Sequence, residues 1–345
     1  MRFFFTEEDD HTRIRGADIR SALVAARHDV LHGRHGDAAP AATDVWMHGL
    51  GVDAHRPLEP MLVASLMATR AQLVLFQLCD APSMWFHRLP PELMERTRLF
   101  LRNHWPSDRS GMPPQVRDRI GWLPPMLKTM PPRAGRPLSE RAIATMFYGT
   151  RTGGANLPGG RNAREEAVRL MYASGLPFEG GLLPHNESHY DPPAELTVAR
   201  IHKHTHTRRL RNARICIAPW GNHPLTYRVF EGLACRCLVI AQSLRDCAIV
   251  DDGLAAGRHY VEVAADLSDL TELTRHYLRH PDEAQRIADA GHQHFVARLA
   301  ARGPLVSQWI FGACVASWGS LYKPSAARGL VASLRGLAAR LGRRY

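Results

Sequence analysis

The chain has 345 residues, of which 45% are hydrophobic and 22% are charged, and its formal net charge is +11 at pH 7. This length exceeds one ordinary core and suits two domains of roughly 150 residues each, and the composition excludes a largely disordered chain. No stretch approaches the run of about 18 apolar residues that a transmembrane helix needs, and the positive charge implies an anionic partner or surface.

The cysteines and the distribution of the basic residues further limit the class of protein and its expected partners. Six cysteines occur, and none forms a Cys-x-x-Cys pair, which favours reduced thiols in a cytoplasmic protein over disulfides or a zinc site. The arginines are distributed along the chain rather than gathered in one stripe, so no specific nucleic-acid partner is expected.

The first 130 residues alternate short apolar runs with helical patterns. Strands are expected at 1–5, 43–51, 72–80 and 96–106, and helices at 15–31 and 57–71. Strands that alternate with helices predict an α/β domain with a mainly parallel sheet. Residues 107–140 are rich in proline, glycine and arginine, which is typical of a linker.

A second α/β series follows the linker. Strands are expected at 142–149, 177–183, 214–219, 237–241 and 259–263. Helices are expected at 161–175, 194–211 and 226–236, with two more between 266 and 295. The predicted scheme is an acceptor-side domain (1–130), a linker (131–140), a donor-side domain (141–300) and C-terminal helices with a basic tail (301–345).

The segment "APWGNHPLTYRVFEG" (218–232) holds the most specific pattern in the second series. It leaves a strand, turns through Gly221 and Pro224, and starts a helix near Thr226. A helix N-terminus offers unpaired N–H groups to a phosphate, Arg228 in the first turn adds a fixed charge, and Glu231 can accept from sugar hydroxyls. The alternative is a structural ion pair between Arg228 and Glu231 at i,i+3.

This segment resembles the C-terminal domain of GT-B glycosyltransferases (glycosyl transferases group 1), most like the exostosin-like and CgeB-like groups. Those groups carry a pattern near "aPrG…s.R.fEal..Gc.pVi", and this chain reads "APWGNHPLTYRVFEGLACRCLVI". The resemblance covers about 140–296, and in 1–106 it is architectural. It implies two Rossmann-like domains facing a cleft, followed here by a basic amphipathic C-terminal helix.

The resemblance also implies roles for particular residues. Gly221 and Arg228 would bind the donor diphosphate, Glu231 the ribose or sugar, and Gly149 with Arg151 would approach the phosphates from the other side. Further donor-binding positions in the same turn and helix start are Asn222, His223 and Tyr227.

Three positions depart from the family pattern. His223 stands where retaining members carry a second glutamate, so a retaining Glu-x7-Glu site is not supported. Tyr227 replaces a small residue before the arginine, and Arg236 stands at a position where the family usually has glycine.

An inverting transfer needs a general base, and we expect Asp80, which follows an apolar strand, in that role. The acids and the histidine at 7–11 are alternatives. For each of these residues, the structural alternative is a helix cap or a salt bridge.

No metal is expected. The histidines of "HKHTH" (202–206) would not share a helix face, which favours a solvated helix over a metal site. The segment "LPGGRNARE" (157–165) lacks the P-loop and Rossmann signatures and is typical of a flexible loop before a helix, although its Arg161 and Arg164 could reach a phosphate.

The last 23 residues form a basic helical pattern with two interpretations. They could lie on an anionic membrane surface, where lipid-linked acceptors reside, or pack back on the N-terminal domain. The resemblance implies a cytoplasmic glycosyltransferase, which would be peripheral at the inner membrane if the tail binds lipid. It would move a sugar (hexosyl or related) from a nucleotide-diphosphate donor to a hydroxyl of a glycan, lipid-linked or protein acceptor, with no further cofactor. The alternative is a non-catalytic relative that binds a nucleotide or glycan as an assembly partner.

Overall fold

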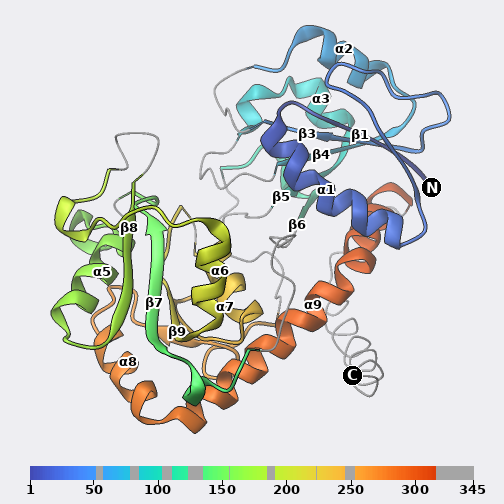
Figure 1. The fold of residues 1–345 in the computed structure, drawn as a ribbon. Helices are drawn as coiled ribbons and strands as arrows, with labels where there is room; N and C mark the ends of the chain where they lie inside the picture. Colours follow the sequence, from blue (N-terminus) through green and yellow to red (C-terminus); the bar gives the residue numbers. More distant parts are fainter. Residues whose placement is uncertain are drawn as a thin grey trace. The chain divides into compact units, whose positions relative to one another are not determined.

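The computed structural model describes residues 1–51, 57–77, 85–102, 111–122, 135–154, 156–184, 191–222, 224–244 and 253–315. The chain forms two compact units, one of residues 1–126 with 297–345 and the other of residues 127–296. Each is built on a parallel sheet with flanking helices, as the alternating pattern of the sequence predicts (Figure 1). Among the described residues, no helix is long and apolar enough to cross a membrane.

The first unit has a six-stranded parallel sheet in the order β2-β1-β3-β4-β5-β6. Its strands are β1 (Arg2–Glu7), β2 (Asp29–His32), β3 (Val45–Gly49), β4 (Gln72–Gln77), β5 (Thr97–Arg102) and β6 (Ile120–Trp122). Its helices are α1 (Asp10–Ala25), α2 (Pro60–Ala68), the 3-10 turn η1 (Trp85–Arg88), α3 (Pro91–Arg96) and α4 (Pro114–Arg117).

The core of this unit forms where alternate strand residues meet α1. Phe3 and Phe5 of β1 pack with Ile19 and Leu23 of α1, and all four side chains are nearly or fully buried. Burying one such side chain contributes roughly 1.5–3 kcal/mol, which explains why the three-Phe run of the sequence lies in a central strand.

The second unit has a five-stranded parallel sheet in the order β11-β10-β9-β7-β8. Its strands are β7 (Ile143–Thr150), β8 (Phe178–Leu183), β9 (Ala213–Ala218), β10 (Leu238–Gln242) and β11 (Val261–Val263). Its helices are η2 (Leu138–Glu140), η3 (Pro158–Gly160), α5 (Ala163–Ala173), η5 (Ala194–Leu196), α6 (Lys203–Arg211), α7 (Tyr227–Ala234), α8 (Leu270–Arg279) and the start of α9 (Pro281–Val315).

Helices cover both faces of this second sheet. The helices α5 and α8 lie on one face, and α6 and α7 lie on the other (Figure 1). Among the described residues of this unit, Cys216, Cys235 and Cys237 are buried free thiols. Burial raises the pKa of Cys216 to about 12, so this thiol stays protonated and serves as a small core residue rather than a nucleophile.

The strand order of the second sheet marks where a ligand belongs. From β7 the chain crosses to β8 on one side, and its next crossover places β9 on the other side of β7. In open parallel sheets, ligands bind beyond the carboxyl ends of the strands at such a switch point. The loops after β7 and β9 therefore enclose the expected ligand position of this unit.

Several elements differ from the sequence-based expectation, among them the helices α3 and α4, which were not expected. The helix expected at 15–31 ends at Ala25, because Arg27 turns the chain in a left-handed conformation (φ 65°) and residues 29–32 form β2 against β1. In the proline- and glycine-rich stretch 107–140, residues 120–122 form β6, which lies within the predicted acceptor-side domain (1–130). The helix expected at 194–211 is shortened to α6, because residues 194–196 form η5 and Thr197 pairs with Leu182 of β8 in an isolated parallel bridge.

Candidate functional site

The two loops at the switch point of the second sheet contact each other directly. The Asn156 side-chain amide donates to the Gly221 carbonyl at 3.1 Å, and Gly153 adopts φ +105° beside the same carbonyl. A Cβ built on Gly153 would lie 2.4 Å from that oxygen, so only glycine allows this approach. The loop after β7 is thus fastened to the loop after β9.

Helix α7 begins at this junction. Thr226 is its N-cap residue, yet its side chain makes no capping hydrogen bond, and its buried Oγ1 has no hydrogen-bond partner among the described residues. The first N–H groups of a helix lack partners within the helix and carry its positive dipole end. An uncapped start at a switch point is a suitable place for an anion.

Arg228 lies in the first turn of α7 and reaches across to β7. Its Nη2 donates to the Tyr148 carbonyl, and its Nη1 donates to Glu231 Oε2 at 2.5 Å. Its Nε is buried without a partner among the described residues. The Arg228 and Glu231 side chains are 18% and 20% exposed, so both remain accessible to a ligand.

Arg228 and Glu231 form the i,i+3 ion pair that the sequence analysis gave as the structural alternative to a donor-binding site. The pair does not use the whole guanidinium, because only Nη1 contacts the Glu231 carboxylate. A diphosphate could therefore bind the arginine beside the glutamate or in exchange for it.

A third side chain, His206 of α6, contacts the same guanidinium. Its Nε2 lies 2.6 Å from Arg228 Nη1, and its ring meets the Tyr148 ring edge-on, with centroids 6.2 Å apart. Burial, and next the Arg228 charge, lower the pKa of His206 to about 3, so its ring is neutral at physiological pH. The expectation of a solvated helix face holds for the exposed His202 and His204 and is wrong for His206.

Arg164 of α5 also lies at this junction. Its Nη1 donates to the Thr150 carbonyl at 3.0 Å and to Thr152 Oγ1 at 2.6 Å. A Cβ built on Gly221 would lie 2.2 Å from Arg164 Nη2, so the missing side chain of Gly221 is what admits this guanidinium. The structure therefore brings a second arginine to the switch point, from the first turn of the helix expected at 161–175.

Each of the other residues expected at the donor site has its own surroundings in the structure. Arg151 donates from Nε to Glu165 Oε2 at 2.8 Å, which engages it with α5. Gly149 is buried near the end of β7, where a Cβ would lie 2.7 Å from Phe147 Cζ. Asn222 and Tyr227 are half-buried beside Gly221 and Arg228 in the chain. His223 and Asp80 lie outside the described residues.

The first unit places two acids at the carboxyl end of β1, where they were alternatives for a general base. The nearly buried Glu7 is bound by Arg20 and by His32 Nε2 at 2.7 Å. Glu8 is bound by Arg88 Nη2 at 2.9 and 3.1 Å, and it accepts from Gly51 N–H. Both carboxylates are therefore held by cations in this structure.

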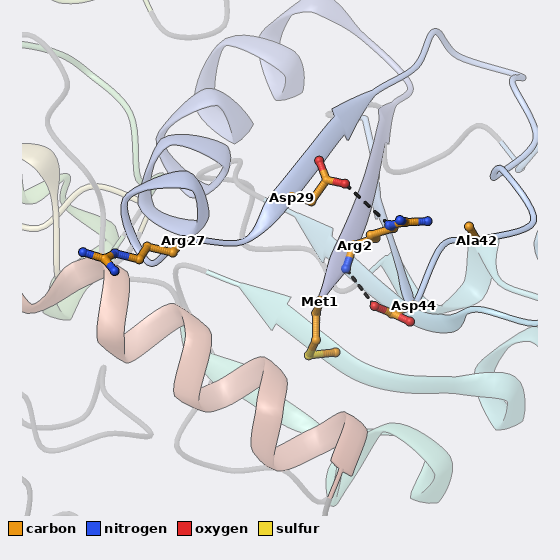
Figure 2. Close-up of a pocket in the computed structure, with 6 residues that line it drawn as sticks. All are labelled: Met1, Arg2, Arg27, Asp29, Ala42 and Asp44. Carbon is orange, nitrogen blue, oxygen red and sulfur yellow. Dashed lines mark hydrogen bonds and ion pairs between the residues drawn. The ribbon is translucent and has the colours of Figure 1, made fainter.

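A shallow pocket of about 440 Å³ in the first unit lies at the amino ends of its strands. It is lined by Met1, Arg2, Arg27, Asp29, Ala42 and Asp44 (Figure 2). The Arg2 backbone N–H donates to Asp44 at 2.7 Å, and the Arg2 guanidinium pairs with Asp29 at 3.7 Å. These residues lie at the amino ends of β1, β2 and β3, opposite to the edge where parallel sheets bind ligands. The pocket is therefore not the candidate site.

The described part of the chain contains no group of three or more His, Cys, Asp or Glu side chains that could hold a metal ion. The chemistry that the described residues offer at the switch point is the binding of an anion by arginines and a helix start.

Comparison with known proteins finds a sequence match that lies mostly in the second unit. Residues 184–302 match a family model described as glycosyl transferase-like. The matched segment begins just after β8, ends within α9 and contains Gly221, Arg228 and Glu231. No curated protein sequence matches the chain.

Solved structures are similar to most of the chain. A glycosyltransferase from Rickettsia africae ESF-5 matches 92% of this chain and 99% of its own, with a TM-score of 0.56 at 10% identity. The β-glucosyltransferase of phage T4 matches 92% of this chain and 100% of its own, with a TM-score of 0.50 at 10% identity. TarM covers 79% of this chain and 55% of its own, with a TM-score of 0.50 at 7% identity.

Identities this low show a shared fold alone, and the exostosin-like or CgeB-like assignment stays a prediction. The chain has the fold of the GT-B glycosyltransferases, and its residues 184–302 carry a glycosyl transferase-like sequence.

Proposed function

We propose that the protein is a glycosyltransferase that moves a sugar from a nucleotide-diphosphate donor to an acceptor hydroxyl. One observation carries the proposal: at the switch point of the second sheet, Arg228 and the uncapped start of α7 present positive charge beside the carboxyl end of β7. The glycosyl transferase-like match over residues 184–302 supports the same assignment.

The proposed reaction follows from these groups. The acceptor oxygen bonds to the anomeric carbon of the sugar while the bond from that carbon to the diphosphate oxygen breaks. The leaving diphosphate takes the electron pair, and Arg228 with the N–H groups of α7 stabilises the growing negative charge. Glu231 accepts hydrogen bonds from the ribose or the sugar, and a base takes the acceptor proton, for which Asp80 remains our candidate.

The partners and the location belong to the same proposal. The acceptor is a hydroxyl of a glycan, a lipid-linked precursor or a protein, and the diphosphate is stabilised without a metal. The enzyme works in the cytoplasm, and its basic tail (323–345) associates with an anionic membrane surface, as the composition of that segment suggests.

The second candidate is a non-catalytic relative that binds a nucleotide or a glycan. The Arg228–Glu231 pair favours it, because the glutamate already balances part of the charge that a leaving diphosphate needs. His223 at the position of the second glutamate favours it as well.

Substitution of Arg228 by alanine tests the proposal. Calorimetry with UDP, GDP and ADP, each with and without EDTA, should show EDTA-insensitive binding of one diphosphate by the wild type. Arg228→Ala should weaken that binding by roughly tenfold to a hundredfold, because a charge-assisted hydrogen bond contributes about 1.5–3 kcal/mol. Turnover of the matching nucleotide sugar should fall by about 10²–10³, as when one donor to a developing charge is removed.

Arg169→Ala is the matched control, since Arg169 is an exposed arginine that also pairs with a glutamate, Glu165. It should leave binding and turnover near the wild-type values. Wild-type turnover by Arg228→Ala would refute the catalytic assignment. Diphosphate binding without turnover of any nucleotide sugar would favour the non-catalytic relative.

A further inference from the structure

His206 is the residue at this site that the glycosyltransferase pattern does not account for. It belongs to the short helix α6, while Arg228 and Glu231 belong to α7. The Nη1 atom of Arg228 is shared between His206 Nε2 at 2.6 Å and Glu231 Oε2 at 2.5 Å. With the Tyr148 carbonyl on Nη2, the guanidinium is held from three directions.

The chemistry of the contact fixes the state of the imidazole. An arginine guanidinium only donates hydrogen bonds, so His206 Nε2 must accept and the ring proton must be on Nδ1. A protonated ring would place a second cation against Arg228. The lowered pKa of His206, about 3, agrees with a neutral ring, and it arises first from burial and then from the Arg228 charge.

The surroundings of the ring explain why it does not turn away. The Tyr148 ring packs edge-on against it, and the Tyr148 hydroxyl is itself fixed by Arg209 Nη1 at 2.6 Å and Glu179 Oε1 at 3.3 Å. The charged groups around the imidazole are thus Arg228 and Glu231 on α7, Arg209 on α6 and Glu179 on β8. Opposite charges pair within this set, as the bonds between Arg209 and Glu179 and between Arg228 and Glu231 show.

We propose that His206 is a positioning residue for Arg228, one that fixes the guanidinium at the carboxyl end of β7 without cancelling its charge. A carboxylate in its place would hold the arginine equally well but would neutralise it, in addition to Glu231. A neutral acceptor leaves the arginine with a net attraction for a diphosphate. This inference rests on the proposed function of the site.

Three substitutions of His206 separate geometry from charge. His206→Gln keeps a neutral acceptor near the position of Nε2, His206→Glu keeps an acceptor but adds a negative charge, and His206→Ala removes the acceptor. The full chain would be titrated calorimetrically with inorganic pyrophosphate and with UDP and GDP, and thermal unfolding would be recorded for each variant. His204→Ala is the matched control, because His204 is exposed on the same helix.

We expect the glutamine variant to bind pyrophosphate within about threefold of the wild type, and the alanine variant to bind about tenfold more weakly, the effect of one lost hydrogen bond. The glutamate variant should bind more weakly than the alanine variant while unfolding at a temperature near that of the glutamine variant. His204→Ala should match the wild type. If His206 had only a structural role, the pyrophosphate affinity of the variants would follow their thermal stability instead.

Different results would refute the role of His206 and the proposed function of the site. If the wild type binds pyrophosphate and the alanine variant binds it equally well, or if the glutamate variant binds like the glutamine variant, the role of His206 is refuted while the proposed function stands. If the wild type binds neither pyrophosphate nor any nucleoside diphosphate, both fall.

A spectroscopic measurement tests the same residue without any ligand. ¹⁵N NMR of labelled histidine should show His206 as a neutral ring protonated at Nδ1 and unchanged between pH 8 and about 5, since its pKa of about 3 lies well below that range. His204→Ala should retain this signal and His206→Gln should lose it. Protonation of the assigned ring above pH 5.5 would overturn the proposal.

Discussion

Arg228 and Glu231 form an ion pair whose partners have separate tasks in the proposed reaction. Both belong to α7, and their contact of 2.5 Å is of the i,i+3 type. Pairs of this kind contribute only about 0.2–0.5 kcal/mol to a helix, so stability alone is a weak reason for two half-buried charges at this place. The presence of a third partner, His206, on another helix also goes beyond what a helix-stabilising pair requires.

Glu231→Gln distinguishes the two tasks of the pair. Removing the carboxylate leaves Arg228 with its full charge, so inorganic pyrophosphate should bind several-fold more tightly. A nucleoside diphosphate should gain less or bind more weakly, because the ribose loses an acceptor; a hydrogen bond to a charged group contributes about 1.5–3 kcal/mol. Calorimetry with both ligands on the same variant measures this difference. Equal changes for pyrophosphate and for UDP or GDP would show that Glu231 does not contact the nucleoside.

Arg236 shows how a departure from the family pattern is accommodated. It follows α7 in a left-handed conformation with φ 58°, the conformation for which glycine is usual at this position. Its Nε donates to Asp289 Oδ1 at 2.5 Å, and Arg236 holds the pKa of that carboxyl below its usual value against the opposing effect of burial. The ion pair therefore offsets part of the backbone strain that a side chain brings here.

At the scale of elements, the candidate site depends on two loops that lack regular structure. The loop after β7 approaches the loop after β9 through Gly153, and the arginine of α5, Arg164, enters beside Gly221 because that residue has no side chain. Each loop alone presents few cationic groups. The crossover order of the sheet joins them with the start of α7, which is the reason that the site lies here and not at another strand end.

Gly153→Ala tests this junction, with Gly154→Ala as its matched control. Both glycines have positive φ, but a Cβ on Gly153 would collide with the Gly221 carbonyl, whereas a Cβ on Gly154 meets no atom within 4 Å. Gly154→Ala should cost about 1–2 kcal/mol of folding free energy from backbone strain and leave pyrophosphate binding unchanged. Gly153→Ala should cost more and weaken pyrophosphate binding, because the two loops must separate. Denaturant unfolding and calorimetry measure both effects, and equal behaviour of the two variants would contradict this account of the junction.

At the scale of the whole molecule, the net charge of +11 is concentrated in part in the last 23 residues. These residues lie outside the described structure, so their two interpretations, a membrane surface or the N-terminal domain, still rest on the sequence. Six cationic side chains occur there: Lys323, Arg328, Arg335, Arg340, Arg343 and Arg344. Near an anionic bilayer each such side chain contributes about 1 kcal/mol of attraction.

Deletion of residues 323–345 separates the interpretations. If the tail binds membranes, the full chain should sediment with vesicles of anionic phospholipid at low salt, and the truncated chain should not. Vesicles of neutral lipid are the control, and pyrophosphate binding should be the same for both chains. A truncated chain that sediments equally well would contradict a membrane role of the tail. A lower unfolding temperature without any loss of sedimentation would favour packing on the N-terminal domain.

Much of the architecture follows from local sequence pattern. The apolar runs of β1, β3, β4, β7 and β9 are strands because buried parallel strands need continuous hydrophobic sequence, and the start of α7 after Pro224 follows from local turn chemistry. The short strand β2 was not predicted, since its four residues continue a helical pattern and only pairing with β1 makes them a strand. Similarly, the beginning of the expected helix at 194–211 pairs with β8 instead.

Some features of the candidate site could likewise be predicted from the sequence, and others required the tertiary structure. The sequence alone determined that Arg228 and Glu231 occupy one helix just after a strand and a glycine turn, because helix spacing and turn chemistry are local. Only the tertiary structure decided that His206 and the Tyr148 carbonyl hold that arginine and that Arg164 fills the space at Gly221. These partners come from α6, β7 and α5, which are distant along the chain and meet only because the crossovers of the sheet bring their ends to one edge.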